Sequence, residues 1–285
     1  MAAKTLLYTV LALLAFAANS VLCRLAMGEE GSIDAAGFTI IRLLSGIVVL
    51  MLILAFGGRQ KGVAFAQSGS WSAAFMLFVY AICFSFAYVS LDTATGAVIL
   101  FGSVQLSIIL LSLLSGNRLL LAEWVGVLLA FAGFVYLMLP GVTMPSVSGF
   151  MLMVTAGCAW GVYTLKGKGS KNPLMDTGNN FLRTSPLLVV LAVVSWQNLQ
   201  FSAEGVLWAV LSGAIASGIG YTIWYMALGG LATTQAAVVQ LSVPVIAAVG
   251  GIVFVAEPIT LRLVIAAAMI LSGIFVVVLG RRKAS

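Results

Sequence analysis

Apolar residues run in long stretches along this chain, and short clusters of Gly, Pro, Ser and charged residues separate the stretches. Each stretch is close to the roughly 20 apolar residues that an α-helix needs to cross a bilayer. The pattern therefore predicts an all-α integral membrane fold with ten membrane-spanning helices and short loops. The expected helices are 5–26, 33–56, 71–91, 95–114, 120–139, 148–165, 176–196, 206–227, 233–255 and 261–280.

The composition strengthens this interpretation. Of 285 residues, 62% are hydrophobic and 8% are charged, whereas a soluble domain has roughly 25% charged residues. Ten crossings leave no room for a soluble domain. The first apolar stretch continues to about Met27, beyond the roughly 7–15 apolar residues of a signal peptide. We therefore expect it to remain as the first helix.

The distribution of basic residues predicts the orientation. Cytoplasmic loops of membrane proteins are enriched in Lys and Arg. With the N-terminus in the cytoplasm, ten basic residues fall on that side, and we expect both termini there. They are Lys4, Arg59, Lys61, Arg118, Lys166, Lys168, Lys171, Arg281, Arg282 and Lys283.

The two halves of the chain repeat each other. Similar residues recur at offsets of 137 to 141 positions. The pairs are Ala81 and Gly218, Ser85 and Thr222, Tyr88 and Tyr225, Arg42 and Arg183, Gly126 and Ala266, and Gly133 and Gly273. Five helices per half force the second copy to enter the membrane inverted, which is a transporter architecture with a midplane site. We expect repeats over 1–142 and 143–285.

One predicted helix carries unusual chemistry. In Leu231–Glu257, the amides Gln235 and Gln240 precede Pro244. Proline removes a backbone donor and bends a helix, and polar residues at membrane depth usually face protein or a cavity. The alternative is a bent packing helix whose amides bond to neighbouring helices. The corresponding stretch Thr95–Asn117 has neither the proline nor the acid, so we expect the ninth helix to bend and gate differently from the fourth.

Several motifs carry a family resemblance. The stretch LSVPVIAAVGGIVFVAEPIT contains Pro244, Glu257 and Thr260 before the last helix, and AGCAWGVYTLKGK begins the second half. Over essentially its whole length the chain resembles the ten-helix EamA-type exporters of the drug/metabolite transporter superfamily, and it is similar in organisation to YddG-type amino-acid exporters. The first half departs from the pattern, since Asn117 stands where the glutamate is expected. The resemblance implies a metabolite exporter in a bacterial-type plasma (inner) membrane.

Aromatic and amide side chains are the candidates for substrate contact. Aromatic faces attract an ammonium group, amides bond either end of a zwitterion, and arginine takes a carboxylate. The set suits a small zwitterionic or neutral metabolite such as an amino acid with an apolar side chain. The candidate cavity residues are Asn19, Tyr80, Ser85, Tyr88, Gln105, Trp160, Tyr163, Tyr221, Trp224, Tyr225, Gln235 and Gln240.

Two arginines lie inside predicted helices. Arg42 and Arg183 are about eight residues, or roughly 12 Å, from a helix end. One interpretation is that each arginine recognises an anion or stabilises a gate, and Pro244 is a further gating candidate. The alternative is that each is a structural residue bonded to helix-end carbonyls. If they bind an anion, a carrier of lipid, phosphorylated or nucleotide-sugar anions is the alternative function.

Missing residue types narrow the function further. No acidic residue lies in the middle of a predicted helix, which disfavours cationic drugs, and the sequence has no histidine to relay protons. The three scattered cysteines argue against a disulfide framework or metal cluster. We therefore expect no metal, no cofactor and no enzymatic activity, although a lipid-modifying membrane enzyme is a distant alternative. The expected partners are a small-molecule substrate and the lipid bilayer, without nucleic acid; small residues leave a homodimer open.

Overall fold

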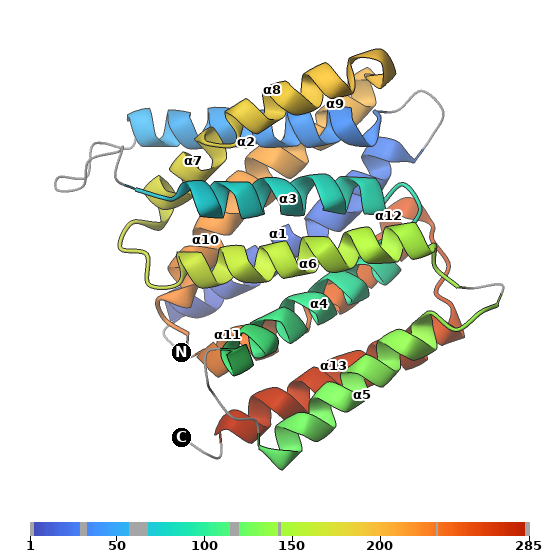
Figure 1. The fold of residues 1–285 in the computed structure, drawn as a ribbon. Helices are drawn as coiled ribbons and strands as arrows, with labels where there is room; N and C mark the ends of the chain where they lie inside the picture. The colour runs from blue at the N-terminus through green and yellow to red at the C-terminus, as the bar shows by residue number, and fades with distance from the viewer. Residues whose placement is uncertain are drawn as a thin grey trace.

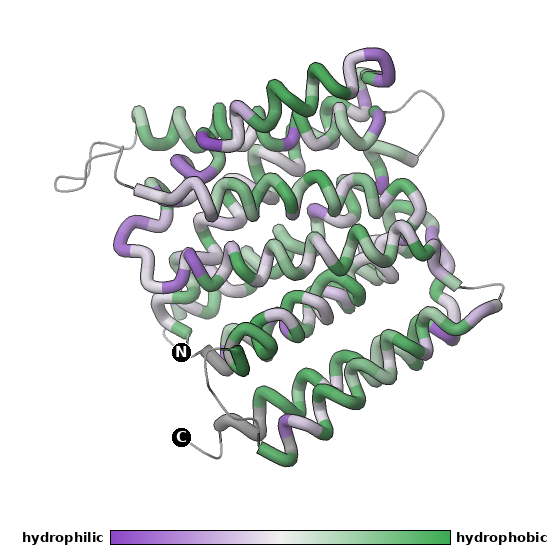
Figure 2. The backbone as a smooth tube through the Cα atoms, in the orientation of Figure 1, coloured by the Kyte–Doolittle hydropathy of each residue, from purple (hydrophilic) through white to green (hydrophobic). Residues whose placement is uncertain are grey.

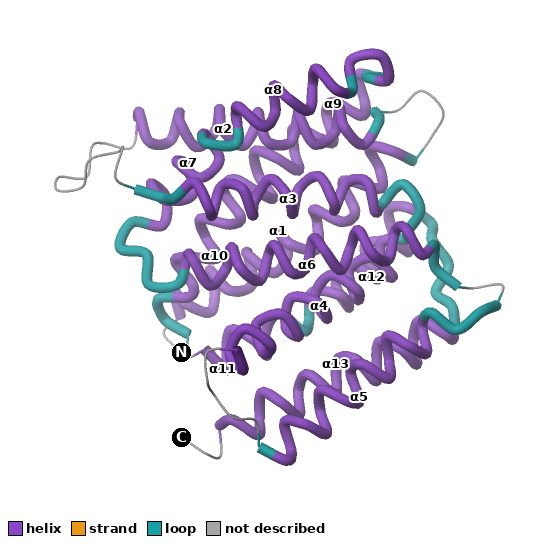
Figure 3. Tube along the Cα trace, in the orientation of Figure 1, coloured by secondary structure: helices purple, strands orange, loops and turns teal. Residues whose placement is uncertain are grey.

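The computed structural model describes residues 3–28, 33–56, 68–114, 120–141, 144–231 and 233–282. Regular structure within these ranges is helical throughout (Figure 3). Hydrophobic residues cover the helices along most of their length, and the most hydrophilic ones gather near helix ends and loops (Figure 2). Arg59, Lys61, Asn117, Arg118 and Lys283, which carried sequence-based expectations, lie outside the described residues.

Five helices make up the described part of the first half of the chain. They are α1 (Ala3–Met27), α2 (Ala35–Phe56), α3 (Trp71–Ala87), α4 (Thr93–Leu114) and α5 (Leu121–Leu137). The third helix was predicted to reach residue 91, but it ends at Ala87. The backbone N–H of its C-cap, Tyr88, still donates to Phe84 O, and the chain then turns toward α4.

The second half contains more and shorter elements. They are α6 (Val147–Gly167), α7 (Pro173–Leu182), α8 (Ser185–Val194), the short 3₁₀ turn η2 (Trp196–Asn198), α9 (Ala203–Val210), the π-helical segment η3 (Leu211–Ile219), α10 (Gly220–Leu228), α11 (Thr233–Gln240), α12 (Val243–Val255) and α13 (Leu261–Arg282). In the described part of the chain, seven helical stretches are long and apolar enough to cross a membrane, and α9, η3 and α10 form one of them.

Two predicted helices are broken. The expected bend before Pro244 is confirmed: α11 ends at Gln240 and α12 begins at Val243, whereas α4 is continuous. The break between α7 and α8, next to Pro186, was not predicted. At each break hydroxyl groups bond carbonyls of the preceding turn: Ser242 Oγ donates to Val239 O at 2.7 Å and Ser185 Oγ to Leu182 O at 2.6 Å. Leu182 O is the carbonyl that Pro186 leaves without a helical N–H partner, whereas Val239 O also accepts from the Ser242 N–H at 3.1 Å.

The helices lie side by side and run roughly along a common direction, and the two chain ends lie on one side of the molecule (Figure 1). Many of the core contacts join a helix of one half of the chain to helices of the other half. Helix α1 packs against α9, η3, α10 and α12, all from the second half, whereas α6 packs against α3 and α4 from the first. Each half therefore completes the core of the other.

Helices α5 and α13 form a pair that packs chiefly on itself, visible as neighbouring green and red ribbons in Figure 1. Glycine makes their close approach possible. A Cβ atom on Gly126 would collide with the carbonyl oxygen of Gly273, and one on Gly273 with that of Gly126. Small residues allow this kind of backbone contact between membrane helices.

Candidate functional site

The candidate site is built around Arg42 on α2. The helix begins after Asp34, whose Oδ2 accepts from the backbone N–H groups of Ala36 and Gly37 at 2.9 and 3.1 Å. This acidic N-cap fixes the start of α2. Arg42 then lies two turns inside the helix with 1% of its surface exposed.

The Arg42 guanidinium is held by neutral oxygens and aromatic faces. Its Nε donates to Ser217 Oγ at 3.0 Å, and its Nη2 donates to Tyr221 OH at 2.8 Å and Tyr80 OH at 3.2 Å. Its Cζ lies 5.3 Å from the Tyr80 ring centroid and 4.7 Å from that of Phe84. Within the described ranges no carboxylate lies at ion-pair distance from Arg42. A buried cation without a counter-ion is costly, and this is the central fact about the site.

The π-helical segment η3 supplies two serines that link Arg42 to Asn19. Ser212 Oγ donates to Asn19 Oδ1 at 2.7 Å, and Ser217 Oγ donates to the same atom at 3.1 Å. These serines are five positions apart, so an α-helix would place them on different faces, whereas the wider π turn brings i and i+5 together. Gly213 lets η3 approach α2, because a Cβ there would collide with Arg42 O.

Aromatic rings surround this polar group. Trp160 on α6 lies 4.5 Å from Tyr221 and 4.9 Å from Tyr80 between ring centroids. Phe16 on α1 lies 5.5 Å from Trp224. The cluster continues from Trp160 through Tyr163 to Tyr225, with centroid distances of 5.4 and 5.8 Å. The rings come from both halves of the chain and exclude water from the Arg42 region.

Eight predicted site residues thus come together. They are Asn19, Arg42, Tyr80, Trp160, Tyr163, Tyr221, Trp224 and Tyr225. The structure adds Phe16, Phe84, Phe181, Ser212 and Ser217, which were not predicted. The π geometry of η3 turns both serines toward Asn19.

Other predicted residues have different environments. Ser85 Oγ donates to Ala81 O of its own helix. Gln105 and Gln240 are buried, and Gln235 is exposed; among the described contacts no hydrogen bond joins them to Arg42. Pro244 is buried in the first turn of α12.

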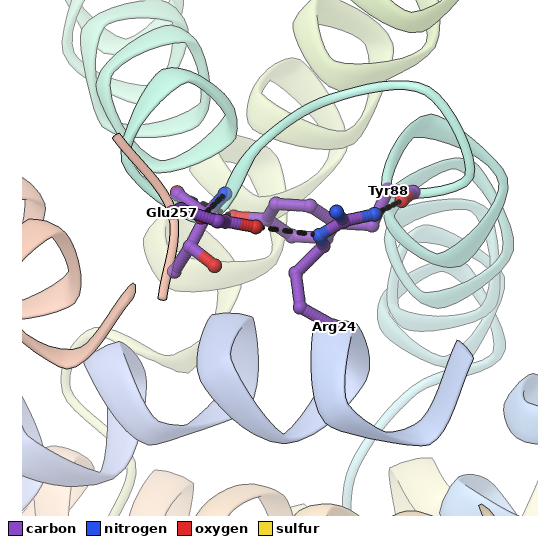
Figure 4. Close-up of polar contacts among 4 residues, drawn as sticks. Arg24, Tyr88 and Glu257 are labelled. Atoms are coloured by element: carbon purple, nitrogen blue, oxygen red, sulfur yellow. Dashed lines mark hydrogen bonds and ion pairs between the residues drawn. The ribbon is translucent and has the colours of Figure 1, made fainter. Parts of the chain in front are cut away.

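Tyr88 belongs to a closure at one end of the molecule (Figure 4). Arg24 near the end of α1 pairs with Glu257 at 2.8 Å between Nε and Oε1, and its Nη1 donates to Tyr88 O at 2.9 Å. Glu257 Oε2 accepts from the backbone N–H of Thr93 at 2.7 Å. The structure thus joins α1 and the α3–α4 turn of the first half to the α12–α13 turn of the second. We call this set of Arg24, Tyr88, Thr93 and Glu257 the outer latch, after the side of the membrane on which the orientation predicted from the sequence would place it.

Local backbone and charge shape the outer latch. Ala256, the C-cap of α12, has φ 55°, in the left-handed region that costs a non-glycine residue about 1–2 kcal/mol. This turn precedes Glu257, whose N–H bonds Gly251 O at 3.1 Å. Burial raises the pKa of Asp92 in the adjacent turn, and the nearby Glu257 carboxylate raises it further, whereas Arg24 lowers it.

Arg183 belongs to a closure between the start of α3 and α7. Its Nη1 donates to Ser68 O at 2.8 Å, and its Cζ lies 5.8 Å from the Trp71 ring centroid. The N–H groups of Gly69 and Ser70 donate to Asp176 Oδ1 and Asn180 Oδ1, both at 2.8 Å. Arg183 therefore binds a backbone carbonyl in the segment that precedes α3. We call residues 68–71 with α7 the inner clamp, again after the side that the predicted orientation would give it.

The described residues contain no group of three or more Cys, Asp, Glu or His side chains that could hold a metal ion. The polar groups near Arg42 are hydroxyls, an amide and aromatic rings. Such groups can hold a charged or polar molecule through hydrogen bonds and ring faces.

Comparisons with known proteins agree with a transport function. The model of the EamA-like transporter family matches residues 147–279. The chain is 46% identical over 278 residues to the uncharacterized protein PA1977 of Pseudomonas aeruginosa, covering 98% of this chain and 96% of that protein. An uncharacterized transporter of Archaeoglobus fulgidus is 27% identical over 266 residues, covering 87% of this chain and 88% of that protein, and a second one is 28% identical over 203 residues, covering 70% and 73%.

A solved crystal structure shares the fold with a TM-score of 0.67 and 20% identity, and the match covers 98% of both chains. The apolar helices and the relatives named transporters identify a multi-pass membrane transporter rather than an enzyme. The chain belongs to the EamA-like transporter family of the drug/metabolite transporter superfamily.

Proposed function

We propose that this protein exports small zwitterionic or neutral metabolites, amino acids with apolar side chains foremost, across a bacterial plasma (inner) membrane by alternating access. The observation that carries the proposal is the buried cluster around Arg42. Helices α1, α2 and α3 of the first half and η3 and α10 of the second build it together. A polar site between inverted halves is where such carriers bind substrate.

The proposed architecture has ten crossings, with repeats over 1–142 and 143–285 and both termini in the cytoplasm. Contacts between α5 and α13 support it. Gly126 packs on Gly273, and Gly133 lies against Ala266. If Gly126 corresponds to Ala266 and Gly133 to Gly273, these two contacts are the same contact seen from each repeat, as a two-fold axis requires.

Two closures support alternating access. The outer latch joins the halves at one end, and the inner clamp joins residues 68–71 of the first half to α7 of the second. Arg42 is buried while both closures are formed, which fits a cycle in which one closure opens while the other holds. A permanently open channel would not need both.

Flux assays with purified protein in liposomes test the proposal. Vesicles loaded with unlabelled leucine or phenylalanine should accumulate the labelled amino acid by counterflow, with saturation, and protein-free vesicles should not. The panel should also include neutral metabolites, phosphorylated sugars and nucleotide sugars. Absence of counterflow for every amino acid and neutral metabolite in the panel overturns the proposal.

A second candidate function is the transport of small anions. It is favoured by the single buried cation at the site and the absence of a carboxylate at ion-pair distance within the described ranges. Counterflow of phosphorylated compounds without counterflow of amino acids would select this candidate.

A further inference from the structure

We propose that Arg42 and Asn19 form a subsite for the carboxylate of the substrate, so that a carboxylate is required and an ammonium group is not. This inference rests on the proposed transport function and narrows its substrate class. Both side chains are buried, with 1% of the surface of each exposed. Each also carries one nitrogen without a partner in the described structure, namely Arg42 Nη1 and Asn19 Nδ2.

The hydrogen-bond network fixes which atoms remain available. Ser217 Oγ accepts from Arg42 Nε, so its own proton goes to Asn19 Oδ1. Ser212 Oγ donates to the same oxygen. Asn19 therefore presents its oxygen to the serines, and its Nδ2 donor points away from them. Arg42 uses Nε and Nη2 for protein contacts and leaves Nη1. Two donors remain, on side chains that share Ser217 as a partner.

The charge of the site selects the ligand. The partners of the guanidinium are the Ser217, Tyr80 and Tyr221 hydroxyls and ring faces, all neutral. The described ion pair of the protein, Arg24–Glu257, belongs to the outer latch, where Glu257 is also occupied by Thr93. A bound carboxylate would supply the missing counter-charge, and the buried donors left to hold it are Arg42 Nη1 and Asn19 Nδ2.

The surroundings select the rest of the molecule. The rings of Tyr80, Trp160 and Tyr221 form an apolar wall beside the guanidinium. No carboxylate within the described ranges is placed to receive a substrate ammonium group here, so that group gains at most contact with ring faces. A monocarboxylate with an apolar body is therefore the ligand class, and apolar amino acids belong to it through their carboxylate.

Ligand pairs that differ in one group test the subsite. Leucine, 4-methylpentanoate (leucine without its amino group) and leucinol (leucine with an alcohol in place of the carboxylate) should be titrated into purified protein and followed by tryptophan fluorescence and calorimetry. Leucine and 4-methylpentanoate should bind saturably, and leucinol at least about tenfold more weakly. Equal affinity for leucinol and leucine overturns the subsite.

Two variants separate binding from folding. Asn19→Asp places a carboxylate beside Arg42, so it should keep or raise the melting temperature while weakening leucine binding at least about tenfold. Arg42→Lys should also weaken carboxylate binding at least about tenfold. Arg262→Lys is the control, at a half-buried arginine that bonds Leu139 O away from the site, and it should leave carboxylate binding unchanged. Unaltered leucine affinity in both site variants overturns the subsite.

Failures of the two proposals are distinguishable. If wild-type protein transports leucinol as well as leucine, the carboxylate subsite is wrong and the exporter stands. If carboxylates bind but no panel compound crosses the membrane, the subsite stands and the transport proposal fails.

Discussion

At the scale of single residues, Ser217 holds the site together. Its hydroxyl accepts from Arg42 Nε and donates to Asn19 Oδ1, so one oxygen fixes the orientation of two buried polar side chains. Networks of this kind are costly when one member is removed, because the remaining groups stay buried without partners.

Replacing Ser217 with alanine should lower stability by about 1–3 kcal/mol, the usual cost of leaving a buried donor unsatisfied. The thermal midpoint of the purified protein measures this change. Ser272→Ala is the matched control, since Ser272 is exposed and bonds a carbonyl of its own helix. Equal midpoints for the two variants would show that Ser217 does not support Arg42.

Some residues of the Arg42 cluster could be predicted from the sequence, and others could not. Arg42, Asn19, Tyr80 and Trp160 were predicted because polar and aromatic side chains deep in apolar segments are informative by their type. Ser217 was missed because its role depends on the π-helical turn. A local helix width of this kind leaves no periodic signal in the sequence.

At the scale of elements, turns and breaks position the closures. The outer latch joins the end of α1 to two turns, α3–α4 and α12–α13. Sequence reasoning had placed Pro244 at a bend correctly. It did not pair Arg24 with Glu257, because partners 233 residues apart are brought together only by the packed fold. It also did not predict the break between α7 and α8.

Glu257→Gln should weaken the outer latch. The amide keeps an acceptor for Thr93 but loses the ion pair, and a charge-assisted hydrogen bond contributes about 1.5–3 kcal/mol. The ratio of open to closed state should then rise by roughly tenfold to a hundredfold. Cys23, fully buried one residue before Arg24, reports the opening through its reaction rate with a maleimide added from the latch side, in a background with Cys83 and Cys158 replaced by serine.

The control for this experiment is Glu204→Gln, because Glu204 contacts Trp208 of its own helix rather than the latch. A Cys23 labelling rate that is the same in the Glu257 variant and the control would mean that the latch does not hold this end closed.

At the scale of the whole molecule, the two halves interlock. The principal neighbours of α1 and α6 lie in the opposite half, and α5 packs on α13. The duplication stays a prediction from the sequence, where paired residues recur at nearly constant offsets. Which helices contact which could not be read, because apolar surfaces of membrane helices are interchangeable without the small-residue contacts that only packing reveals.

Gly126→Ala tests the tightest of these contacts. The added methyl group would collide with the Gly273 carbonyl, so we expect a loss of about 1–3 kcal/mol, as for other overpacked sites. Gly229→Ala is the control, because a Cβ there meets Met226 O at an ordinary 3.4 Å. Thermal midpoints and the monodisperse fraction after size-exclusion chromatography measure both, and indistinguishable variants would refute the close contact.

The α5–α13 pair has a consequence for biogenesis. Helix α5 ends at Leu137 and α13 begins at Leu261, so α5 is synthesised well before its partner. At about 5–20 residues per second, α5 waits on the order of 10 s for its partner. Throughout that interval the face of α5 that carries Gly126 is turned to lipid or to the insertion machinery. Helix α5 has only 17 residues. The nascent chain therefore passes through a stage in which its first half is complete in sequence but lacks the helix that covers it.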